Sequence, residues 1–338
     1  MIPPMTKTSW QTALIDAVTD PQELLELLEL DLSWLEQAKA AATLFPLKVP
    51  REFVSRMQKG NINDPLLRQV LPIGDEFKHV HGFEKDPWRE ETINPVPGLL
   101  HRYYGRVLLT LTGSCAINCR FCFRRHFPYA KNNPGTAGWQ RALDYIARDE
   151  TITEIILSGG DPLVMNDSQL YDFTAAVSNI AHLKRLRIHS RMPIVLPERI
   201  TVDLIAWLTC TRLRPVMVVH CNHPQEMTPT VMHAMKKLTA ANISLLNQAV
   251  LLKGVNDNAE TLITLSETLF NAGILPYYLH VLDKVEGCAH FDLNRETAQN
   301  LHWQITQRLP GYLVPKLVRT QAGASAKVRV DRSEFYTA

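Results

Sequence analysis

The most constraining feature of this sequence is a regular alternation of short apolar runs and helical segments from residue 106 onward. β-Branched and Leu-rich runs recur at 107–111, 155–157, 186–188, 216–219, 243–250 and 277–281. Helical segments follow at 138–148, 168–181, 202–210, 229–241, 259–272 and 295–308, a spacing typical of βα units. Because six such units with right-handed crossovers curl readily, we predict an α/β fold with a partial (βα)6, TIM-like barrel.

The chain before this alternation has a different character. Leucines at helical spacing follow Asp20 and Pro21, a pair typical of a helix start, and further helices are expected at 33–44 and after Pro50. The stretch 75–98 is polar and contains prolines, which indicates a connector. We therefore predict an N-terminal helical region with its connector at 1–94, a barrel at 95–330 and a short C-terminal tail at 331–338.

Composition limits the classes of function. A chain of 338 residues with 46% hydrophobic residues is long and apolar enough to fold around a core. Its formal net charge of +2 lacks the basic excess of a dedicated nucleic-acid binder. No apolar stretch approaches the roughly 18 residues of a membrane span. We expect a cytoplasmic protein that binds neither nucleic acid nor membrane directly.

Three of the six cysteines crowd together directly after the first predicted strand, as Cys115, Cys119 and Cys122. Thiolates three and four positions apart can converge on one metal cluster while backbone amides point at its sulfides. This spacing predicts a [4Fe–4S] cluster with one iron open to a ligand. Zinc with His126 as fourth ligand, or ordinary buried thiols, are the alternatives.

A second candidate site ends the next predicted strand, where Gly159, Gly160 and Asp161 stand in a row. Glycines allow a backbone to approach a ligand closely, and the carboxylate of Asp161 offers a negative partner for an amine. Alone, this tripeptide would be an ordinary turn. Behind the cysteine triplet, at this distance, it indicates a ligand site.

Basic residues mark a possible phosphate site. Arg102 and Arg106 flank Tyr103, and two arginines four positions apart can grip a phosphate dianion. Near the other end of the chain, the small residues 323–326 precede Lys327. A lysine presented in this way can form a Schiff base with pyridoxal 5′-phosphate (PLP).

In this order, these motifs resemble the radical S-adenosylmethionine (SAM) enzymes, and in particular the lysine 2,3-aminomutase family, which also uses PLP. The resemblance covers about 95–330. It implies a radical SAM partial (βα)6 barrel that holds a [4Fe–4S] cluster, SAM and PLP. It also implies an isomerase that converts (S)-α-lysine to (R)-β-lysine by a 5′-deoxyadenosyl-radical shift of the amino group from C2 to C3.

The resemblance assigns roles by position. The three cysteines would ligate the cluster, and Lys327 would be the catalytic, PLP-bonding lysine. Arg124 would pair with the substrate carboxylate and Asp283 with its distant ammonium. For His220, a satisfied core histidine is the alternative reading. The remaining positions are cofactor contacts: Arg102, Tyr103 and Arg106 for PLP, and Gly159, Gly160, Asp161, His220 and Gln248 for SAM.

The sequence departs from the catabolic members of that family at two places. They carry a second aspartate seven residues before the PLP lysine, where this chain has Thr320, and Asn258 stands where one of their zinc cysteines would be. Such a short variant is similar to the members that supply β-lysine for modification of elongation factor P through a lysine ligase. The implied partners are lysine, that factor and its ligase, and an electron donor such as flavodoxin or ferredoxin; a homo-oligomer is possible.

Three rival functions stay open. A free-amino-acid 2,3-aminomutase of metabolism, for lysine or glutamate, is the nearest, because Thr320 weakens lysine recognition. A non-catalytic iron–sulfur protein would have no use for Lys327 and Arg102. A radical SAM enzyme acting on RNA would be expected to carry more basic charge than +2.

Overall fold

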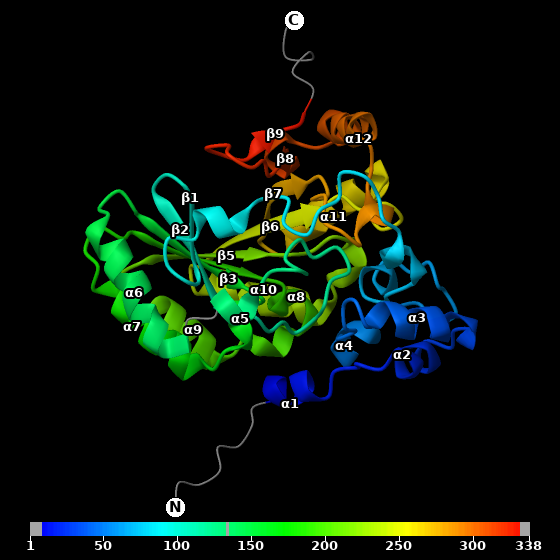
Figure 1. The fold of residues 1–338 in the computed structure, drawn as a ribbon, viewed down its shortest axis with the longest axis horizontal. Helices are drawn as coiled ribbons and strands as arrows, with labels where there is room; N and C mark the ends of the chain where they lie inside the picture. The colour runs from blue at the N-terminus through cyan, green and yellow to red at the C-terminus, as the bar shows by residue number, and fades with distance from the viewer. Residues whose placement is uncertain (1–8, 133–134, 332–338) are drawn as a thin grey trace, which may run out of the picture.

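A computed structural model describes residues 9–132 and 135–331. Its described strands form one sheet whose spatial order is the order of the chain (Figure 1). β2 to β8 run parallel, while β1 and β9 add antiparallel strands at the two edges, so the described strands do not close into a ring. The strands are β1 Leu99–Tyr103, β2 Arg106–Thr112, β3 Glu154–Gly159, β4 Arg185–Ser190, β5 Arg214–Val219, β6 Ser244–Val250, β7 Leu275–His280, β8 Lys316–Arg319 and β9 Val328–Arg329.

The six strands expected from the sequence are confirmed as β2 to β7. β3 is buried along its whole length, as expected for a parallel strand covered on both faces. The sequence did not predict β1, β8 or β9. These strands are short and lie toward the sheet edges, where period-two alternation is weak. The architecture is therefore an open, partial βα barrel with antiparallel additions.

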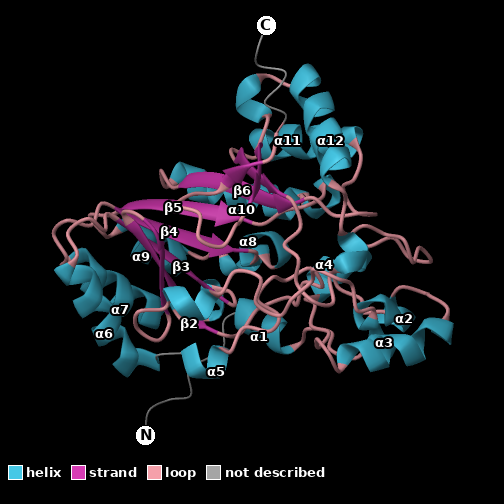
Figure 2. Ribbon diagram, turned by 45° about the horizontal axis from the view of Figure 1, so that its top comes forward, coloured by secondary structure: helices cyan, strands magenta, loops and turns pink. Residues whose placement is uncertain are grey.

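The predicted helices of the βα units are confirmed, and side-chain caps begin several of them. Thr201, Thr228 and Asn294 each accept a hydrogen bond from a backbone N–H three residues on. Asn258 does the same for Thr261, at 2.9 Å, so this position starts a helix. Figure 2 shows the helices set around the strands. They are α6 Gly135–Arg148, α7 Asp167–Ser178, α9 Val202–Thr209, α10 Pro229–Ala240, α11 Ala259–Asn271 and α12 Arg295–Arg308, with the short helix α5 Tyr129–Asn132 before α6 and the short helix α8 Met192–Val195 between α7 and α9.

The N-terminal region is helical, as predicted, and lies below the barrel at the right of Figure 1. The carboxylate of Asp20 caps the first leucine-rich helix, which starts at Pro21. The helix expected at 33–44 is instead a 3-10 turn, Leu32–Trp34, followed by an α-helix. The four helices are α1 Ser9–Ile15, α2 Pro21–Leu27, α3 Leu35–Ala42 and α4 Arg51–Val54.

One apolar core joins this region to the barrel. Its buried members run from Trp10 in α1 to Val330 beyond β9. The boundary predicted at 94/95 therefore divides residues that share a core, and it stays a prediction. Of the predicted tail, residues 332–338 lie outside the described part of the chain.

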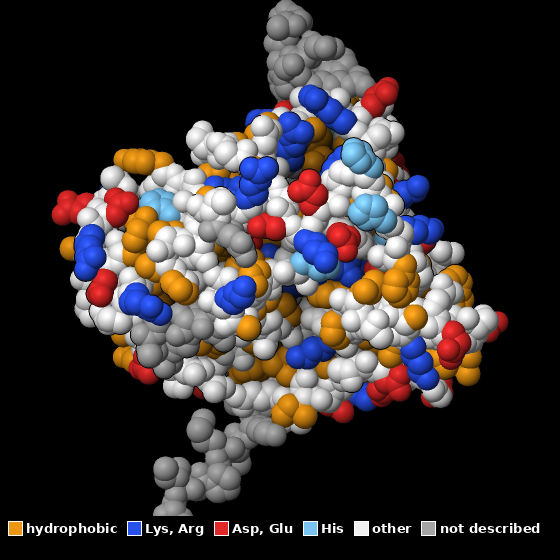
Figure 3. Space-filling view, viewed as in Figure 1, with side chains coloured by type: hydrophobic (Ala, Val, Ile, Leu, Met, Phe, Trp, Pro, Cys, Tyr) orange, Lys and Arg blue, Asp and Glu red, His pale blue; other side chains and the backbone are white. Residues whose placement is uncertain are grey.

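The surface mixes charges of both signs. On the face drawn in Figure 3, Lys and Arg side chains are interspersed with Asp and Glu side chains, in keeping with the formal net charge of +2. None of the helices in the described ranges has both the length and the apolar character that a bilayer span requires.

Candidate active site

A cavity of about 260 Å³ opens at the carboxyl ends of the parallel strands, the edge where βα barrels place their chemistry. The loops after β2, β3, β5 and β7 and the end of β6 all contribute to its wall. The wall brings together residues far apart in the chain, among them Tyr103, Arg106, Cys115, Cys119, Cys122, Arg124, Gly159, Gly160, Asp161, His220, Gln248, Asp283 and Lys327. Every residue to which the resemblance assigns a role, except Arg102, therefore lines this cavity.

The three thiols of the cysteine triplet lie around the cavity. Burial raises the pKa of Cys115 and Cys119, and it raises the pKa of Cys122 to about 12. Arg191 counteracts this at Cys119, where its Nη1 donates to Sγ at 2.7 Å. A buried guanidinium beside a thiol favours the thiolate, which is the form that binds metal.

The donor set of this loop is three thiols. Within the described residues, no group of three His, Cys, Asp or Glu side chains is arranged to hold one metal ion. Cys115, Cys119 and Cys122 line one wall, and three thiolates are the ligands that a [4Fe–4S] cluster with one open iron takes. His126, the fourth ligand of the zinc alternative, is turned elsewhere, with Nε2 3.2 Å from the carbonyl oxygen of Glu286.

Gly159 and Gly160 pack the end of β3 against the cysteine loop. Gly159 has φ of 121°, and a Cβ there would lie 2.5 Å from the carbonyl oxygen of Thr112. A Cβ on Gly160 would collide with the backbone of Ser114. From the sequence, we expected these glycines to let the backbone come close to a ligand. The structure shows that the close packing of the two loops already requires glycine at both positions.

The carboxylate of Asp161 is buried and holds the loops after β3 and β4 together. It accepts hydrogen bonds from the Ser190 hydroxyl at 2.7 Å and from the backbone N–H groups of Leu163, Arg191 and Met192 at 2.9–3.0 Å. Burial raises the pKa of Asp161, and these donors oppose the rise. The sequence did not reveal this structural role, because three of the donors, Ser190, Arg191 and Met192, come from the next βα unit.

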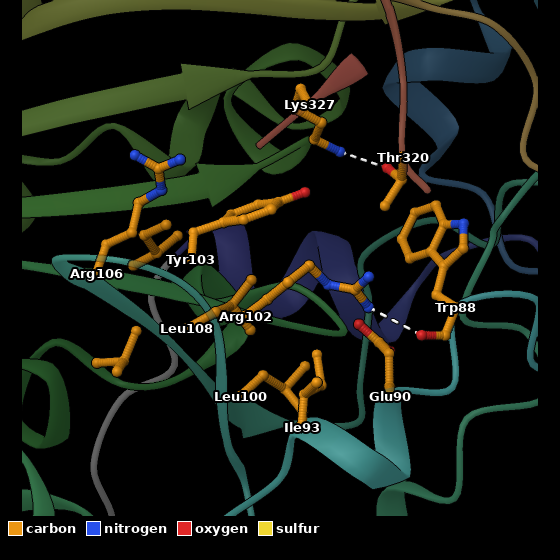
Figure 4. A pocket seen from close by; sticks show the side chains of 12 residues that line it. Trp88, Glu90, Ile93, Leu100, Arg102, Tyr103, Arg106, Leu108, Thr320 and Lys327 are labelled. Atoms are coloured by element: carbon orange, nitrogen blue, oxygen red, sulfur yellow. Dashed lines mark hydrogen bonds between the residues drawn. The ribbon is translucent and has the colours of Figure 1, made fainter. Parts of the chain in front are cut away.

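A smaller cavity of about 80 Å³ adjoins the first, and the two share Trp88, Tyr103, Arg106, Ile156 and Lys327 in their walls. Arg102 lines it too, with Nη2 donating to the carbonyl of Trp88 at 3.1 Å (Figure 4). The guanidinium of Arg106 stands 5.0 Å from the centre of the Tyr103 ring. The buried Tyr103 hydroxyl has no hydrogen-bond partner among the described residues. Two guanidinium groups and a spare hydroxyl fit a phosphate.

The charges of Lys327 and Asp283 interact in this region. Removal from bulk water lowers the pKa of the Lys327 amine and raises the pKa of the Asp283 carboxyl, and each group opposes the shift of the other. The Nζ of Lys327 donates to Thr320 Oγ1 at 2.6 Å. A lysine with a lowered pKa is a better nucleophile near neutral pH.

Arg124 is buried and paired with Glu90, which the sequence did not single out. Nε and Nη2 of Arg124 donate to the two carboxylate oxygens of Glu90 at 2.9 and 2.8 Å. The remaining nitrogen, Nη1, lies 3.3 Å from Ser158 Oγ. Glu90 lies in the predicted connector, where neither periodicity nor spacing distinguishes it from its charged neighbours. The edge of Arg124 that bears Nη1 is therefore the one left for a ligand.

Histidines form the part of the wall nearest β4 to β7. His220 Nε2 lies 2.9 Å from Gln248 Nε2, so the two residues predicted near SAM contact each other. His189 and His280 also line the cavity, and their Nε2 atoms have no partner among the described residues. Burial lowers the pKa of all three, that of His220 to about 3, so the imidazoles are neutral. The sequence missed His189 and His280, which look like ordinary strand residues.

Known proteins resemble this chain in sequence over nearly its whole length. A family model described as a 4Fe-4S single cluster domain matches residues 104–189. The L-lysine 2,3-aminomutase of Escherichia coli (strain K12) is 50% identical over 327 residues, 96% of this chain and 95% of the relative. The enzyme of the same name from Haemophilus influenzae is 49% identical over 319 residues, 94% of each chain.

Among solved structures, Streptococcus suis SuiB bound to S-adenosylmethionine matches 70% of this chain and 54% of that one, with a TM-score of 0.48 and 14% identity. The order and direction of the strands, rather than this partial likeness, define the fold. About half of the residues are identical to those of two L-lysine 2,3-aminomutases along nearly the full length of both. The chain therefore belongs to the L-lysine 2,3-aminomutase family.

Proposed function

We propose that this protein is an L-lysine 2,3-aminomutase that converts (S)-α-lysine to (R)-β-lysine. The amino group moves from C2 to C3 and one hydrogen moves from C3 to C2, so the atoms balance without a second substrate. The observation that carries the proposal is a single wall that contains three thiols, Lys327, Arg124 and Asp283. These groups match a cluster, an amine-bonding cofactor and the two charged ends of a lysine.

The residues divide among the cofactors as follows. When bound, the cluster and SAM would supply a radical and PLP would supply a conjugated ring over which an unpaired electron can spread, so the hard chemistry belongs to the cofactors. Cys115, Cys119 and Cys122 would hold the cluster. The other contacts are Arg102, Tyr103, Arg106 and Lys327 for PLP, and Gly159, Gly160, Asp161, His220 and Gln248 for SAM.

The protein's own contribution is to orient the substrate and keep water away. Arg124 would bind the α-carboxylate through its Nη1 edge, because Glu90 occupies the opposite edge. Asp283 would receive the side-chain ammonium. Fixing both ends of a flexible substrate supplies much of the rate of such a reaction. His189 and His280 are removed from bulk water, and a wall of this kind would keep water from the reacting carbons.

We also propose how the product is used. β-Lysine from this enzyme would be attached to elongation factor P by a lysine ligase in the cytoplasm, and flavodoxin or ferredoxin would deliver the electron. Thr320 supports this assignment, because a pocket with one lysine-binding carboxylate instead of two suits low-flux modification better than bulk catabolism. Supplying a deletion strain with β-lysine should restore the modification of elongation factor P if this assignment is correct.

The decisive experiment is anaerobic reconstitution with iron, sulfide and PLP, followed by incubation with lysine, SAM and a reductant. Product mass and chirality should identify (R)-β-lysine. Cys119→Ala should abolish reductive cleavage of SAM while PLP remains bound, and it serves as the matched control. A reconstituted enzyme that prefers glutamate to lysine, or protein that carries stoichiometric zinc without iron, would overturn the proposal.

A further inference from the structure

The hairpin at the end of the sheet places Thr320 opposite Lys327. β8 and β9 pair antiparallel with Arg319 opposite Val328, so the next residues toward the loop are Thr320 and Lys327. The six residues between them turn through Gly323, whose φ is 75°. Directly opposed side chains on antiparallel strands lie within contact distance. The strand register therefore brings the Thr320 hydroxyl next to the Lys327 amine.

The contact itself lies in the wall of the smaller cavity. Lys327 Nζ donates to Thr320 Oγ1 at 2.6 Å, and the same amine stands 5.5 Å from the centre of the Trp88 ring. Figure 4 shows the amine between the Thr320 hydroxyl and the hydroxyl end of Tyr103. The amine is thus held by a neutral acceptor on one side, in a wall to which Arg102 and Arg106 also belong.

We propose that Thr320 is a positioning residue for Lys327: its hydroxyl holds the free amine at the cavity wall, ready to bond PLP, and it is not a contact for the substrate. This inference rests on the proposed function, because it takes Lys327 as the lysine that bonds PLP. Thr320 thereby has a role of its own, whereas the sequence analysis noted only that a substrate-binding aspartate is missing at this position.

The chemistry explains why an uncharged partner matters. The unprotonated amine attacks the aldehyde carbon of PLP, a C=N bond forms, and the aldehyde oxygen leaves as water with two protons from the nitrogen. Only the unprotonated amine has the lone pair for this step. A hydroxyl at position 320 holds the nitrogen without adding a negative charge, whereas a carboxylate there would stabilise the ammonium form. The groups that face Lys327 are the carboxylates Asp283 and Glu90, the cations Arg102 and Arg124, and the neutral His189 and His280.

The test measures PLP capture by protein stripped of PLP, without lysine or SAM. Absorbance follows the rate from roughly pH 6 to 10, and borohydride with peptide mapping locates the bond. Thr320→Ser keeps the hydroxyl and should reproduce the wild-type rate and pH midpoint. Thr320→Asp should raise the midpoint by about one unit or more, since an opposite charge at this distance favours the ammonium. Thr320→Val keeps the shape and should slow capture about 10-fold or more at every pH, because the amine is no longer held.

Thr209→Val is the matched control and should capture PLP as the wild type does, because Thr209 is exposed and its hydroxyl donates to carbonyl groups of its own helix. The proposal is overturned if Thr320→Asp and Thr320→Val keep the wild-type rate and midpoint. It is also overturned if Thr320→Val weakens lysine binding but leaves PLP capture intact, which would return this position to the substrate. Lysine turnover by the wild type is measured separately, so failure of the aminomutase proposal is distinguishable from failure of this one.

Discussion

At the scale of single residues, the carboxylates of Glu90 and Asp283 differ in how they are paired. Glu90 is committed to Arg124 by two hydrogen bonds. Asp283 shares its surroundings with Lys327, and burial raises the pKa of its carboxyl while Lys327 opposes the rise. Asp283 is therefore the carboxylate that is available to a cation entering the cavity, and its charge depends on pH.

We predict that affinity for lysine decreases as the pH falls through the raised pKa of Asp283. The sign follows from the shift: a carboxyl with a raised pKa is neutral below it, and a neutral carboxyl does not bind an ammonium by charge. Asp283→Asn should weaken lysine binding about 10- to 150-fold and remove this pH dependence. Calorimetric titration with lysine across pH checks both. The same pH dependence in the variant would contradict the assignment.

At the scale of elements, the segment before β1 acts as part of the barrel and not as a linker. The 3-10 helix Glu90–Ile93 places Glu90 against Arg124, in the loop after the cysteines. Both side chains are buried, with 7% and 5% of their surfaces exposed. This pair ties the segment before the sheet to the cysteine loop.

Glu90→Ala should destabilise the protein by about 3–5 kcal/mol, because it leaves a buried guanidinium without its counter-ion. Urea unfolding measures the loss. Glu260→Ala removes the partner of Arg308 in an exposed pair and is the control, for which we expect a far smaller effect. Equal losses in the two variants would show that the Glu90 pair is not desolvated in solution.

The turn at the end of β3 is a second element on which the site depends. Gly160→Ala should push the cysteine loop away, because the added Cβ meets the backbone of Ser114 and backbone cannot rotate aside. We expect a loss of about 1–3 kcal/mol and a lower iron content after reconstitution. Gly311→Ala is the control, since nothing lies within 4 Å of a Cβ there. Full iron content in Gly160→Ala would contradict this view of the turn.

At the scale of the whole molecule, the N-terminal region contacts the cysteine loop through Gln69. The Gln69 side-chain oxygen accepts hydrogen bonds from Arg191 at 2.6 Å and from Asn222 at 2.9 Å, and its amide donates to Glu226. The backbone carbonyl of Gln69 accepts from the N–H of Arg120, inside the cysteine loop. One buried glutamine thus connects the helical region, the cysteine loop and the ends of two strands.

Gln69→Leu should leave buried donors on Arg191 and Asn222 unpaired and cost about 1–3 kcal/mol of stability. The iron content should fall as well, because Arg191 also donates to Cys119. Chemical unfolding and iron analysis check the two effects. Gln140→Leu, on the exposed face of α6, is the control and should change neither. Unchanged stability in Gln69→Leu would mean that the hydrogen bonds of Gln69 do not stabilise the barrel.

Several features of the site could be predicted because they are local in sequence. The cysteine spacing, the glycines after β3 and the small residues before Lys327 each lie within eight positions. Glu90, His189 and His280 could not be predicted, because their roles depend on neighbours from other βα units. The edge strands were missed for the same reason, since their pairing partners, and not their own patterns, make them strands.

The sequence by itself determined the succession of strands and helices and the motifs at the strand ends, because apolar periodicity and residue spacing are local properties that the chain carries into any fold. Only the tertiary structure decided which of those residues face one another. It joined Arg124 to Glu90 and Thr320 to Lys327, and it raised the pKa of Asp283 through burial. Contacts and burial depend on strand register and on the path of distant loops, and these are decided when the whole chain packs around one core.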